Sequence, residues 1–188
     1  ITYSYTNANG CTNTSSQSVT VTFTDILNYV NLQYPGTASV CQGTSLTAYG
    51  QLYEPGVTEA VGPGAGVTVE FGYSKYNTNP ATWTSWQPAT FNVQAGNNDE
   101  YSSTVLLPAG TYYYTFRYTY VLNGCGYQYG GFSTGGGNPW DGTNYISGVL
   151  TVNAAPTVTV TSPTSIQICP DSSATISATG APTITWMP

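Results

Sequence analysis

Apolar and polar residues alternate with a period of two along most of the chain, which is the pattern of β-strands that bury one face. The clearest run is Tyr112–Tyr120, in which every even-numbered residue is Tyr or Phe and Arg117 lies on the other face. Shorter runs show the same alternation: Ile1–Tyr5, Val19–Phe23, Val67–Phe71 and Val158–Val160. Residues 25–32 could form a helix by their spacing, but they fit a strand equally well. The pattern therefore predicts an all-β fold.

Turn signals separate the predicted strands. The Asn-Gly pairs at 9–10 and 123–124 are typical of two-residue type I′ hairpins. Pro108-Ala109-Gly110 precedes the tyrosine-rich strand, and the glycine-rich segment 130–137 predicts an irregular loop. Strands with one apolar face, joined by such turns, predict antiparallel β-sandwich modules.

Two landmarks each occur twice, which indicates an internal repeat. One is an aromatic strand followed by Asn-Gly-Cys and a closing alternating strand, at 3–21 and again at 118–152. The other is a cysteine that opens an alternating strand ending in glycine, at 41–50 and again at 169–180. Their order predicts the closing hairpin of one module, then a complete module, then the opening part of a further module. The predicted boundaries are 1–24, 25–153 and 154–188.

The four cysteines, Cys11, Cys41, Cys125 and Cys169, lie far apart, and the chain has no histidine. A zinc site would need four thiolates from distant loops, so disulfides formed in an oxidising compartment explain the cysteines better. In the repeat, the opening cysteine of a module is expected to clamp the closing hairpin of the same module, which predicts a Cys41–Cys125 bond. Cys11 and Cys169 then have partners outside this chain or its module. Free buried thiols are the other interpretation.

The two partial modules leave two explanations open. The chain is one window of a longer repeat protein, or its ends are completed by a neighbouring copy through strand addition, with Cys169 meeting Cys11 of the neighbour. The 17 tyrosines exceed the needs of one core. We therefore expect some of them at contacts with neighbouring modules or copies in an array or filament.

Charged residues are scarce: the chain has two basic and eight acidic residues and a net charge of −6. Nucleic acid is excluded as a partner, because binding it needs clustered Lys or Arg. No apolar run approaches the roughly 20 residues of a membrane span, so no membrane insertion is expected. A surface kept soluble by hydroxyl and amide groups is common in extracellular repeat proteins. The expected location is extracellular or on the cell surface.

Catalytic chemistry has little support in the sequence. Without histidine, neither a Ser-His-Asp nor a Cys-His arrangement can form. Glu54 and Glu59 lie among Pro and Gly in a predicted loop, where solvation explains them. We therefore expect a protein that is not an enzyme and needs no cofactor.

Carbohydrate binding is the alternative function. Sugar rings have an apolar face and a rim of hydroxyls, so proteins bind them with aromatic rings beside Asp or Asn. Trp83 and Trp86 are three residues apart, and a third Trp opens the run Trp140–Tyr145. The candidate contacts are Trp83, Trp86, Trp140, Asp141, Asn144 and Tyr145. In the competing interpretation a tryptophan packs into the core, while Asp141 and Asn144 satisfy backbone groups of the glycine-rich loop.

Oxygen-bearing side chains also cluster at Gly96–Glu100, where Asp99 and Glu100 form a weak candidate for a calcium site. The segment lacks the carboxylate spacing of a dedicated calcium loop. A solvated turn before the next strand is the favoured interpretation, and no other metal site is expected.

The Cys-x-x-[Ser/Thr]-Ser openings at Cys41 and Cys169, with the Asn-Gly-Cys hairpins and the Val-Thr-Val strand, resemble a known class of repeats. These are the Ig-like and PKD-like tandem repeats of large bacterial surface adhesins exported by the type 9 secretion system. Segments 1–24 and 154–188 carry the resemblance best, because the 126–148 insertion is not part of the ordinary repeat. The resemblance implies a secreted array of Ig-like sandwiches with an adhesive or structural role and no catalysis.

Two further resemblances concern the central module. Its Trp-Asp-x-x-Asn-Tyr run is similar to starch-binding sandwich modules, which implies sugar contacts by the tryptophans, Asp141 and Asn144. Leu107–Tyr112 resembles the tyrosine corner of Ig-type sandwiches, in which the Tyr hydroxyl bonds back to the preceding turn. The sequence departs from that pattern, because the cysteine lies well beyond Tyr112 instead of two residues after it.

Overall fold

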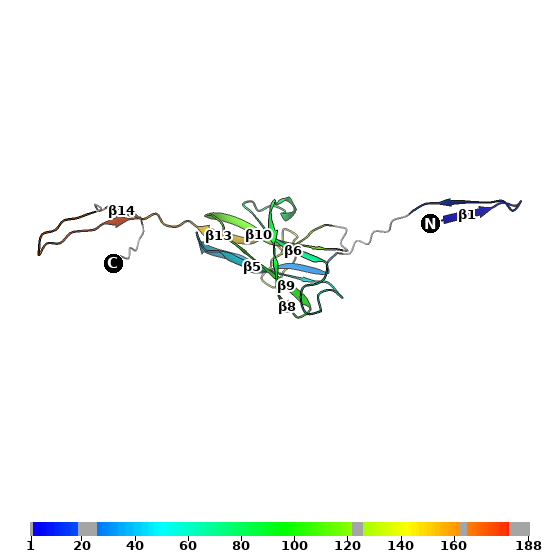
Figure 1. Ribbon diagram of the computed structural model, residues 1–188, viewed down its shortest axis with the longest axis horizontal. Helices are drawn as coiled ribbons and strands as arrows, with labels where there is room; N and C mark the ends of the chain where they lie inside the picture. The colour runs from blue at the N-terminus through cyan, green and yellow to red at the C-terminus, as the bar shows by residue number, and fades with distance from the viewer. Residues whose placement is uncertain (1, 19–25, 122–125, 162–164, 181–188) are drawn as a thin grey trace.

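The computed structural model describes residues 2–18, 26–121, 126–161 and 165–180. Within these ranges the chain consists of strands and loops with a short 3-10 turn at Pro80–Thr82, so the predicted all-β class is confirmed. No helix in this part of the chain is long and apolar enough to span a membrane. The strands form an antiparallel β-sandwich with a two-stranded hairpin on either side of it (Figure 1).

Two sheets make the sandwich. The first has four antiparallel strands in the order β3 (Tyr29–Tyr34), β5 (Leu46–Tyr53), β9 (Asn98–Val105) and β8 (Thr90–Ala95). The second is built on β10 (Gly110–Tyr120), which pairs along one side with β6 (Val67–Ser74) and through it with β7 (Ser85–Pro88). Along its other side β10 pairs first with β13 (Gly148–Asn153) and then with β11 (Gln128–Gly131). The outermost strands are β4 (Thr37–Cys41), parallel to β13, and β12 (Asn138–Pro139), antiparallel to β11.

The central strand β10 shows how the alternation produces the core. Its even-numbered residues point inward, as the sequence predicts, and the buried ones are Tyr112, Tyr114, Phe116 and Tyr118. Tyr114 donates its hydroxyl to Pro35 O at 2.5 Å, and Tyr118 donates to Asn31 O at 2.6 Å. Both phenols are therefore satisfied inside the core, as buried polar groups must be. Burial raises the pKa of both.

The first sheet lies close to β10 at Gly50. The predicted alternation of β5 is confirmed, with Leu46, Ala48 and Gly50 all buried. A side chain at Gly50 would collide with Tyr118 Oη and with the ring of Phe116. Glycine is required here because the two sheets leave no space for a Cβ atom.

The tyrosine corner predicted at the start of β10 is confirmed. Tyr112 Oη donates to Pro108 O at 3.1 Å, across the turn that leads into the strand. This bond ties β10 to the connection from β9, where the chain passes from the first sheet to the second.

The glycine-rich loop predicted at 130–137 is confirmed only in its second half, since Gly135, Gly136 and Gly137 lie between β11 and β12. Gly130 and Gly131 lie in β11, and a side chain at Gly130 would collide with the backbone of Asn31. Glycine thus lets β11 pack closely against β3. The 126–148 insertion covers Thr115, which is fully buried although it lies at an outward position of β10, and the Thr115 hydroxyl donates to Gly130 O.

The N-terminal hairpin pairs β1 (Thr2–Thr6) with β2 (Thr12–Ser16). A hairpin at this place is confirmed, but the turn is not type I′. The connection runs over residues 7–11, and only Gly10 within it has a positive φ, 79°. The Asn7 side chain accepts two backbone N–H groups and holds the loop.

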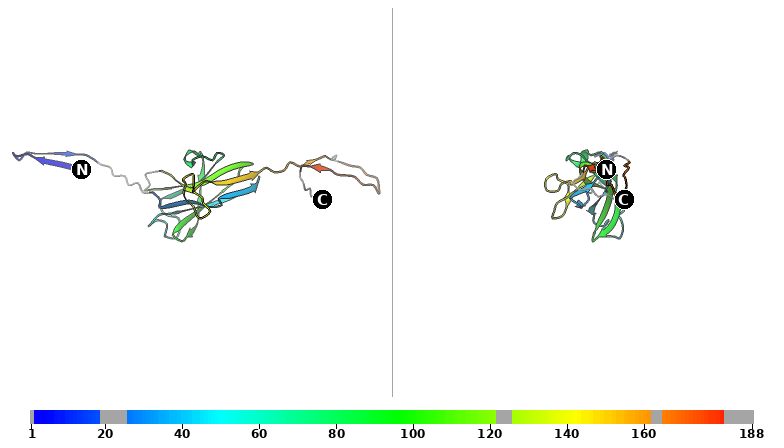
Figure 2. Two further views of the ribbon diagram at one scale, coloured as in Figure 1. Left: turned by 180° about the vertical axis from the view of Figure 1, so that it is seen from behind. Right: turned by 90° about the vertical axis from the view of Figure 1, so that its left-hand side faces the viewer.

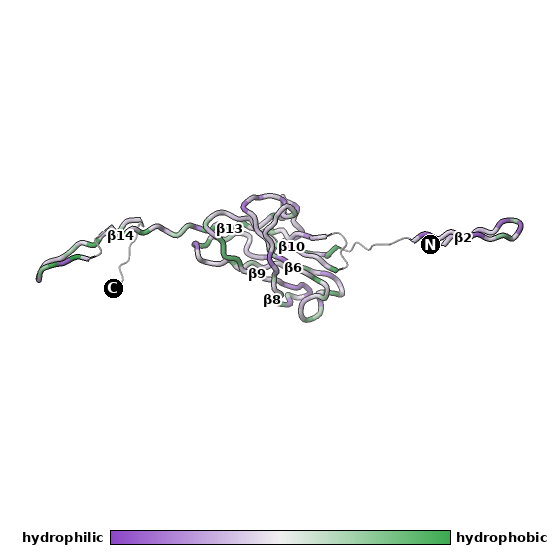
Figure 3. Tube along the Cα trace, turned by 45° about the horizontal axis from the view of Figure 1, so that its top comes forward, coloured by the Kyte–Doolittle hydropathy of each residue, from purple (hydrophilic) through white to green (hydrophobic). Residues whose placement is uncertain are grey.

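The two hairpins lie on opposite sides of the sandwich (Figure 1 and Figure 2). In the C-terminal one, β14 (Thr159–Val160) pairs with β15 (Ala178–Thr179). None of these four strands contains a buried residue, although hydrophobic stretches are visible along the C-terminal hairpin in Figure 3. The predicted run at 19–23 and the Asn-Gly pair at 123–124 lie outside the described residues. The module boundaries stay a prediction.

Candidate functional site

The two neighbouring tryptophans lie together at the start of β7. Asn79 caps the preceding 3-10 turn by accepting the N–H of Ala81, and the turn delivers Trp83 to the edge of the second sheet. The indole rings of Trp83 and Trp86 stack, with centroids 5.9 Å apart and an interplanar angle of 26°. Trp86 Nε1 donates to Trp83 O at 3.0 Å, and Trp83 Nε1 donates to Thr78 Oγ1 at 3.2 Å.

The exposure of this pair differs from that of an open sugar platform. Trp83 is only 7% exposed, which agrees with the interpretation that one tryptophan is packed inside the protein. Trp86 is half-buried and covers Gly72 of β6, where any side chain would collide with the indole. The stacked indoles therefore pack against the edge of the second sheet, and only part of the surface of the two rings is accessible to a ligand.

Arg117 joins Trp86 to two tyrosines that are not among the predicted sugar contacts. The guanidinium carbon lies 4.3 Å from the ring centroid of Trp86 and 3.9 Å from that of Tyr127, so two cation–π contacts enclose it. Its Nε donates to Glu70 Oε2 at 2.7 Å. The rings of Trp86 and Tyr129 are 5.9 Å apart. We call Trp86, Arg117, Tyr127 and Tyr129 the aromatic platform.

The sequence contains a signal for this platform. Arg117 lies at an outward position of the alternation in β10, and Tyr127 and Tyr129 follow the same period of two. The missing information is the pairing of β11 with β10, which sets Tyr129 directly opposite Arg117. Tyr127 is 43% exposed, so its ring is the part of the platform that is accessible to a ligand.

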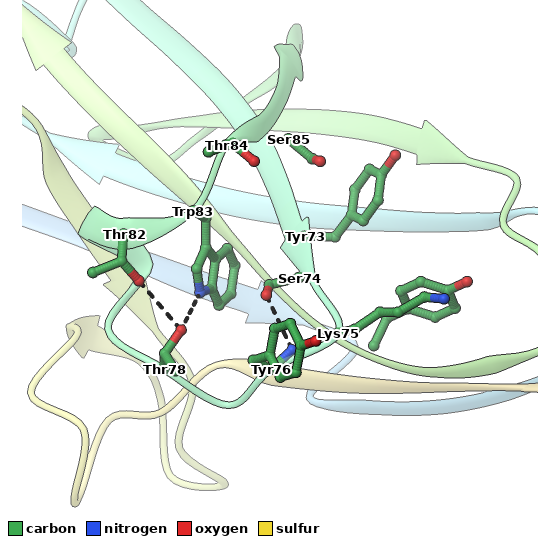
Figure 4. Close-up of a pocket in the computed structure, with 10 residues that line it drawn as sticks. Tyr73, Ser74, Lys75, Tyr76, Thr78, Thr82, Trp83, Thr84 and Ser85 are labelled. Atoms are coloured by element: carbon green, nitrogen blue, oxygen red, sulfur yellow. Dashed lines mark hydrogen bonds between the residues drawn. The ribbon is translucent and has the colours of Figure 1, made fainter.

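A pocket of about 530 Å³ opens beside Trp83 (Figure 4). Its walls come from β6 and the loop after it, the start of β7 and the start of β10. The lining residues are Tyr73, Ser74, Lys75, Tyr76, Thr78, Thr82, Trp83, Thr84, Ser85 and Tyr112. Aromatic rings beside hydroxyl groups are the surroundings that suit the apolar face and polar rim of a sugar ring.

The run Trp140–Tyr145 folds into a loop that Asp141 organises. Asp141 Oδ1 accepts the backbone N–H groups of Thr143 (2.8 Å), Asn144 (2.9 Å) and Tyr145 (2.9 Å). These bonds, that from Tyr145 above all, lower the pKa of Asp141 to about 2. Asn144 donates its side-chain amide to Asp141 Oδ2 at 3.3 Å. Asp141 thus has the role that the competing interpretation gives it, because it accepts backbone N–H groups of the loop, whereas the Asn144 side chain bonds to the Asp141 carboxylate.

Trp140 links this loop to the aromatic platform through its N–H, which donates to Tyr129 O at 2.7 Å. Asn144 lines a separate cavity of about 240 Å³ together with Phe132. Tyr145 is half-buried. The structure links three of the six predicted sugar contacts. Trp83 stacks on Trp86, and Trp140 bonds to Tyr129, whose ring lies beside Trp86. The structure does not bring the other three to the pocket beside Trp83.

The two residues of the calcium candidate lie on opposite faces of β9, as neighbours in a strand do. Asp99 is fully buried, its Oδ2 accepts the N–H of Gly64 at 2.6 Å, and burial raises its pKa. Glu100 instead accepts the side-chain amide of Asn92 at 2.6 Å. The structure does not bring the two carboxylates together. In the described part of the chain, no group of three or more His, Cys, Asp or Glu side chains could hold a metal ion.

The expectation of solvated carboxylates after β5 is wrong for Glu54. This residue is buried, and its carboxylate accepts the N–H of Asn28 at 3.0 Å. Glu59 is exposed, and it accepts bonds from the Tyr53 hydroxyl at 3.1 Å and the Gly56 N–H at 2.8 Å. The burial of Glu54 could not be predicted, because nothing in a turn-rich segment indicates that its first residue points inward.

The described cysteines, Cys11, Cys41 and Cys169, are exposed free thiols. Cys125 lies outside the described residues, so the Cys41–Cys125 bond stays a prediction. Cys41 ends β4, beside the last residue of β13 and near the start of β10. The strand that follows Cys125, β11, begins opposite Tyr118. At 3.3 Å per residue, Tyr118 lies about 25 Å along β10 from the end near Cys41. Peptide mapping of the unreduced protein tests the bond.

The pocket beside Trp83 and the adjoining aromatic platform are the parts of this surface that could receive a ligand, and Trp83 lies between them. Comparison with models of known protein families gives no match, and comparison with curated proteins gives no relative.

Proposed function

We propose that this chain is a non-catalytic segment of a structural or adhesive protein outside the cell, on the cell surface or in a filament. The observation that carries the proposal is the arrangement of its parts in a row. The hairpin β1–β2 lies on one side of the sandwich and β14–β15 lies on the other (Figure 1). A module that is connected at opposite sides can form one link of a linear array, which is what the repeated landmarks predict.

The surface chemistry supports adhesion by uncharged groups. The chain has two basic and eight acidic residues but 17 tyrosines, and Tyr34 and Tyr76 are among the exposed ones. Contacts between charges are screened beyond about 8 Å at physiological salt, whereas aromatic and hydroxyl contacts are not. Adhesion by this surface is therefore expected to depend little on salt.

The environments of the carboxylates support a role without catalysis. Glu54, Glu70, Asp99 and Asp141 each accept hydrogen bonds that hold the fold together. Within the part of the chain that the structure describes, no carboxylate lines the pocket beside Trp83. The sequence has no histidine that could act as a general base in their place.

The adhesive proposal is tested with beads coated with the purified chain, whose retention under flow is measured on surfaces that carry a neutral polysaccharide or the chain itself. We expect retention well above that of beads coated with an unrelated globular protein of similar size. It should change less than about twofold between roughly 0.05 and 0.5 M NaCl. Retention equal to the control on every surface would contradict the proposal, and retention lost at high salt would contradict adhesion by uncharged groups.

Glycan binding is a second candidate function, and one observation favours it. The pocket beside Trp83 combines four aromatic residues with five Ser or Thr residues. Tyr76, one of the four, is 74% exposed, so a sugar could cover its ring without any rearrangement of the core. The predicted contacts Trp83 and Trp86 stack directly beside this pocket.

Electrophoresis through gels that contain dissolved polysaccharides tests the second candidate. We expect the natural chain to be retarded by at least one polysaccharide, and Tyr76→Ala to weaken that affinity by roughly tenfold. The matched control is Tyr5→Ala, which removes another exposed ring, 59% exposed, from the distant N-terminal hairpin and should leave the retardation unchanged. No retardation in any gel, or equal losses in the two variants, would exclude this pocket as a glycan site.

A further inference from the structure

The pocket beside Trp83 holds one of the two basic residues of the chain, Lys75. The other, Arg117, is ion-paired with Glu70 at 2.7 Å and enclosed by aromatic rings. Lys75 forms no ion pair with the described residues. Its ammonium lies 5.9 Å from the ring centroid of Tyr112, near the outer limit of a cation–π contact. Lys75 is therefore the basic side chain available for an anionic ligand.

The charge of the pocket is opposite to that of the molecule. The chain has a net charge of −6, yet none of the carboxylates in the described residues lines this pocket. Lys75 is exposed and lies among aromatic and hydroxyl-bearing residues, so an anion that enters the pocket can reach its ammonium. The pocket is thus suited to a ligand that carries a negative charge on a partly apolar ring.

We propose that this pocket binds an anionic sugar, a unit of a polysaccharide that carries a carboxylate or sulfate group. The exposed ring of Tyr76 provides apolar surface for the face of the sugar, Trp83 forms part of the pocket wall, and the surrounding Ser and Thr hydroxyls bond to the rim of the sugar. Lys75 pairs with the anionic group. The proposal rests on the glycan-binding candidate above and names its class of ligand.

The dimensions and the donor set favour this ligand over other anions. A cavity of about 530 Å³ is within the roughly 300–1,000 Å³ of small-molecule sites. Phosphate chains are bound by several cations or by a row of backbone N–H groups, whereas this pocket has a single lysine among rings and hydroxyls. One charge beside several uncharged contacts matches a sugar with one acidic group.

The test compares polysaccharides that share a backbone and differ in charge. Polygalacturonate and its methyl ester differ only in the carboxylate, and dextran sulfate and dextran differ only in the sulfate, so the two pairs separate the two sources of charge. Gel electrophoresis of the natural chain should show an affinity for at least one charged member about tenfold above that for its neutral partner.

Three variants assign the preference to Lys75. Lys75→Gln should remove the difference between the charged and neutral members of the pair, and Lys75→Arg should retain most of it. Gln42→Glu, at an exposed position of the loop between β4 and β5, lowers the net charge by the same amount and should leave the difference unchanged. Thermal unfolding of each variant checks that the fold is intact.

The outcomes separate this inference from the function on which it rests. Retardation by neutral polysaccharides without a preference for the charged member would overturn the anionic ligand and leave glycan binding in place. A preference that survives Lys75→Gln, or that Gln42→Glu abolishes equally, would also overturn it. No retardation in any gel would overturn both.

Discussion

The sandwich and the two hairpins share one sequence pattern but differ in what covers their strands. In β10, Tyr118 lies in a period-two run and is 0% exposed, whereas in β1, Tyr3 lies in a similar run and is 68% exposed. The difference is a second layer, because β5 lies across the core from β10 while β1 and β2 pair only with each other. Alternation thus defines the two faces of a strand but does not supply the partner that buries one of them.

This difference places the stability of the described protein in the sandwich. Full burial of a large apolar side chain contributes about 1.5–3 kcal/mol, and the core gathers such side chains from both sheets. A two-stranded hairpin on its own is marginally stable in water. Substitutions of the same chemical kind should therefore have unequal effects in the two regions.

The largest expected effect is the loss of a core aromatic ring. Phe116→Ala removes a fully buried ring that packs edge-on against Phe71, with centroids 5.3 Å apart, and leaves a cavity. We expect the free energy of unfolding, measured by urea denaturation, to fall by about 3–5 kcal/mol. Tyr5→Ala removes an exposed ring from the hairpin and should change it by less than about 0.5 kcal/mol. Comparable losses in the two variants would show that the hairpin has a covering layer in solution.

A second, smaller effect is expected where the two sheets touch. Gly50→Ala adds a methyl group against Tyr118 Oη and the ring of Phe116, which should lower the free energy of unfolding by about 1–3 kcal/mol. Gly135→Ala is the control, because nothing lies within 4 Å of the added atom there. Thermal unfolding of the two variants measures the difference. An unchanged midpoint for Gly50→Ala would mean that the sheets can move apart at low cost.

The faces of the sandwich strands could be predicted from the sequence because burial repeats every second residue. The inward positions of β5, β6 and β10 follow from that rule, and so does the bond from Tyr112 to Pro108 through its local motif. These features depend on residues that are close together in the chain. The fold class could therefore be predicted from local patterns in the sequence.

The pairing of distant segments could not be predicted in the same way. The parallel contact of β4 with β13 joins residues more than 100 positions apart, and alternation does not specify neighbours in a sheet. For the same reason the sequence did not indicate that Arg117 lies between Trp86 and Tyr127. The glycines of β11 indicated a loop, although Gly130 allows close contact with β3 and Gly131 allows close contact with Tyr145.

A third prediction concerns a single hydrogen bond at the start of β10. Tyr112→Phe keeps the ring but removes the bond to Pro108 O, which should lower the free energy of unfolding by about 1 kcal/mol. Tyr113→Phe changes the neighbouring tyrosine on the opposite face and should have an effect near zero. Urea denaturation of the two variants measures the difference. Equal effects would mean that the tyrosine corner adds nothing to the stability of the sandwich.

The smallest expected effect is local and depends on acid. The folded-state pKa of Asp141 is lowered to about 2 by backbone N–H groups, with that of Tyr145 first. A depressed pKa means that the carboxylate stabilises the loop fully above its ordinary value near 4, and that this contribution is lost as the pH falls through about 2. The amide signals of Thr143, Asn144 and Tyr145 in NMR spectra should therefore shift together with a midpoint near pH 2.

The N-terminal hairpin provides the contrast for this titration. Residues 2–18 contain no Asp or Glu, so their amide signals should not follow a carboxylate over the same range of pH. Asp141→Asn should abolish the titration of the loop and leave the hairpin signals as they are. A midpoint near pH 4 would mean that the three amides do not bind the carboxylate in solution. Asp141 would then not organise the loop Trp140–Tyr145. The difference between the insertion and the uncovered N-terminal hairpin would depend only on the strands β11 and β12.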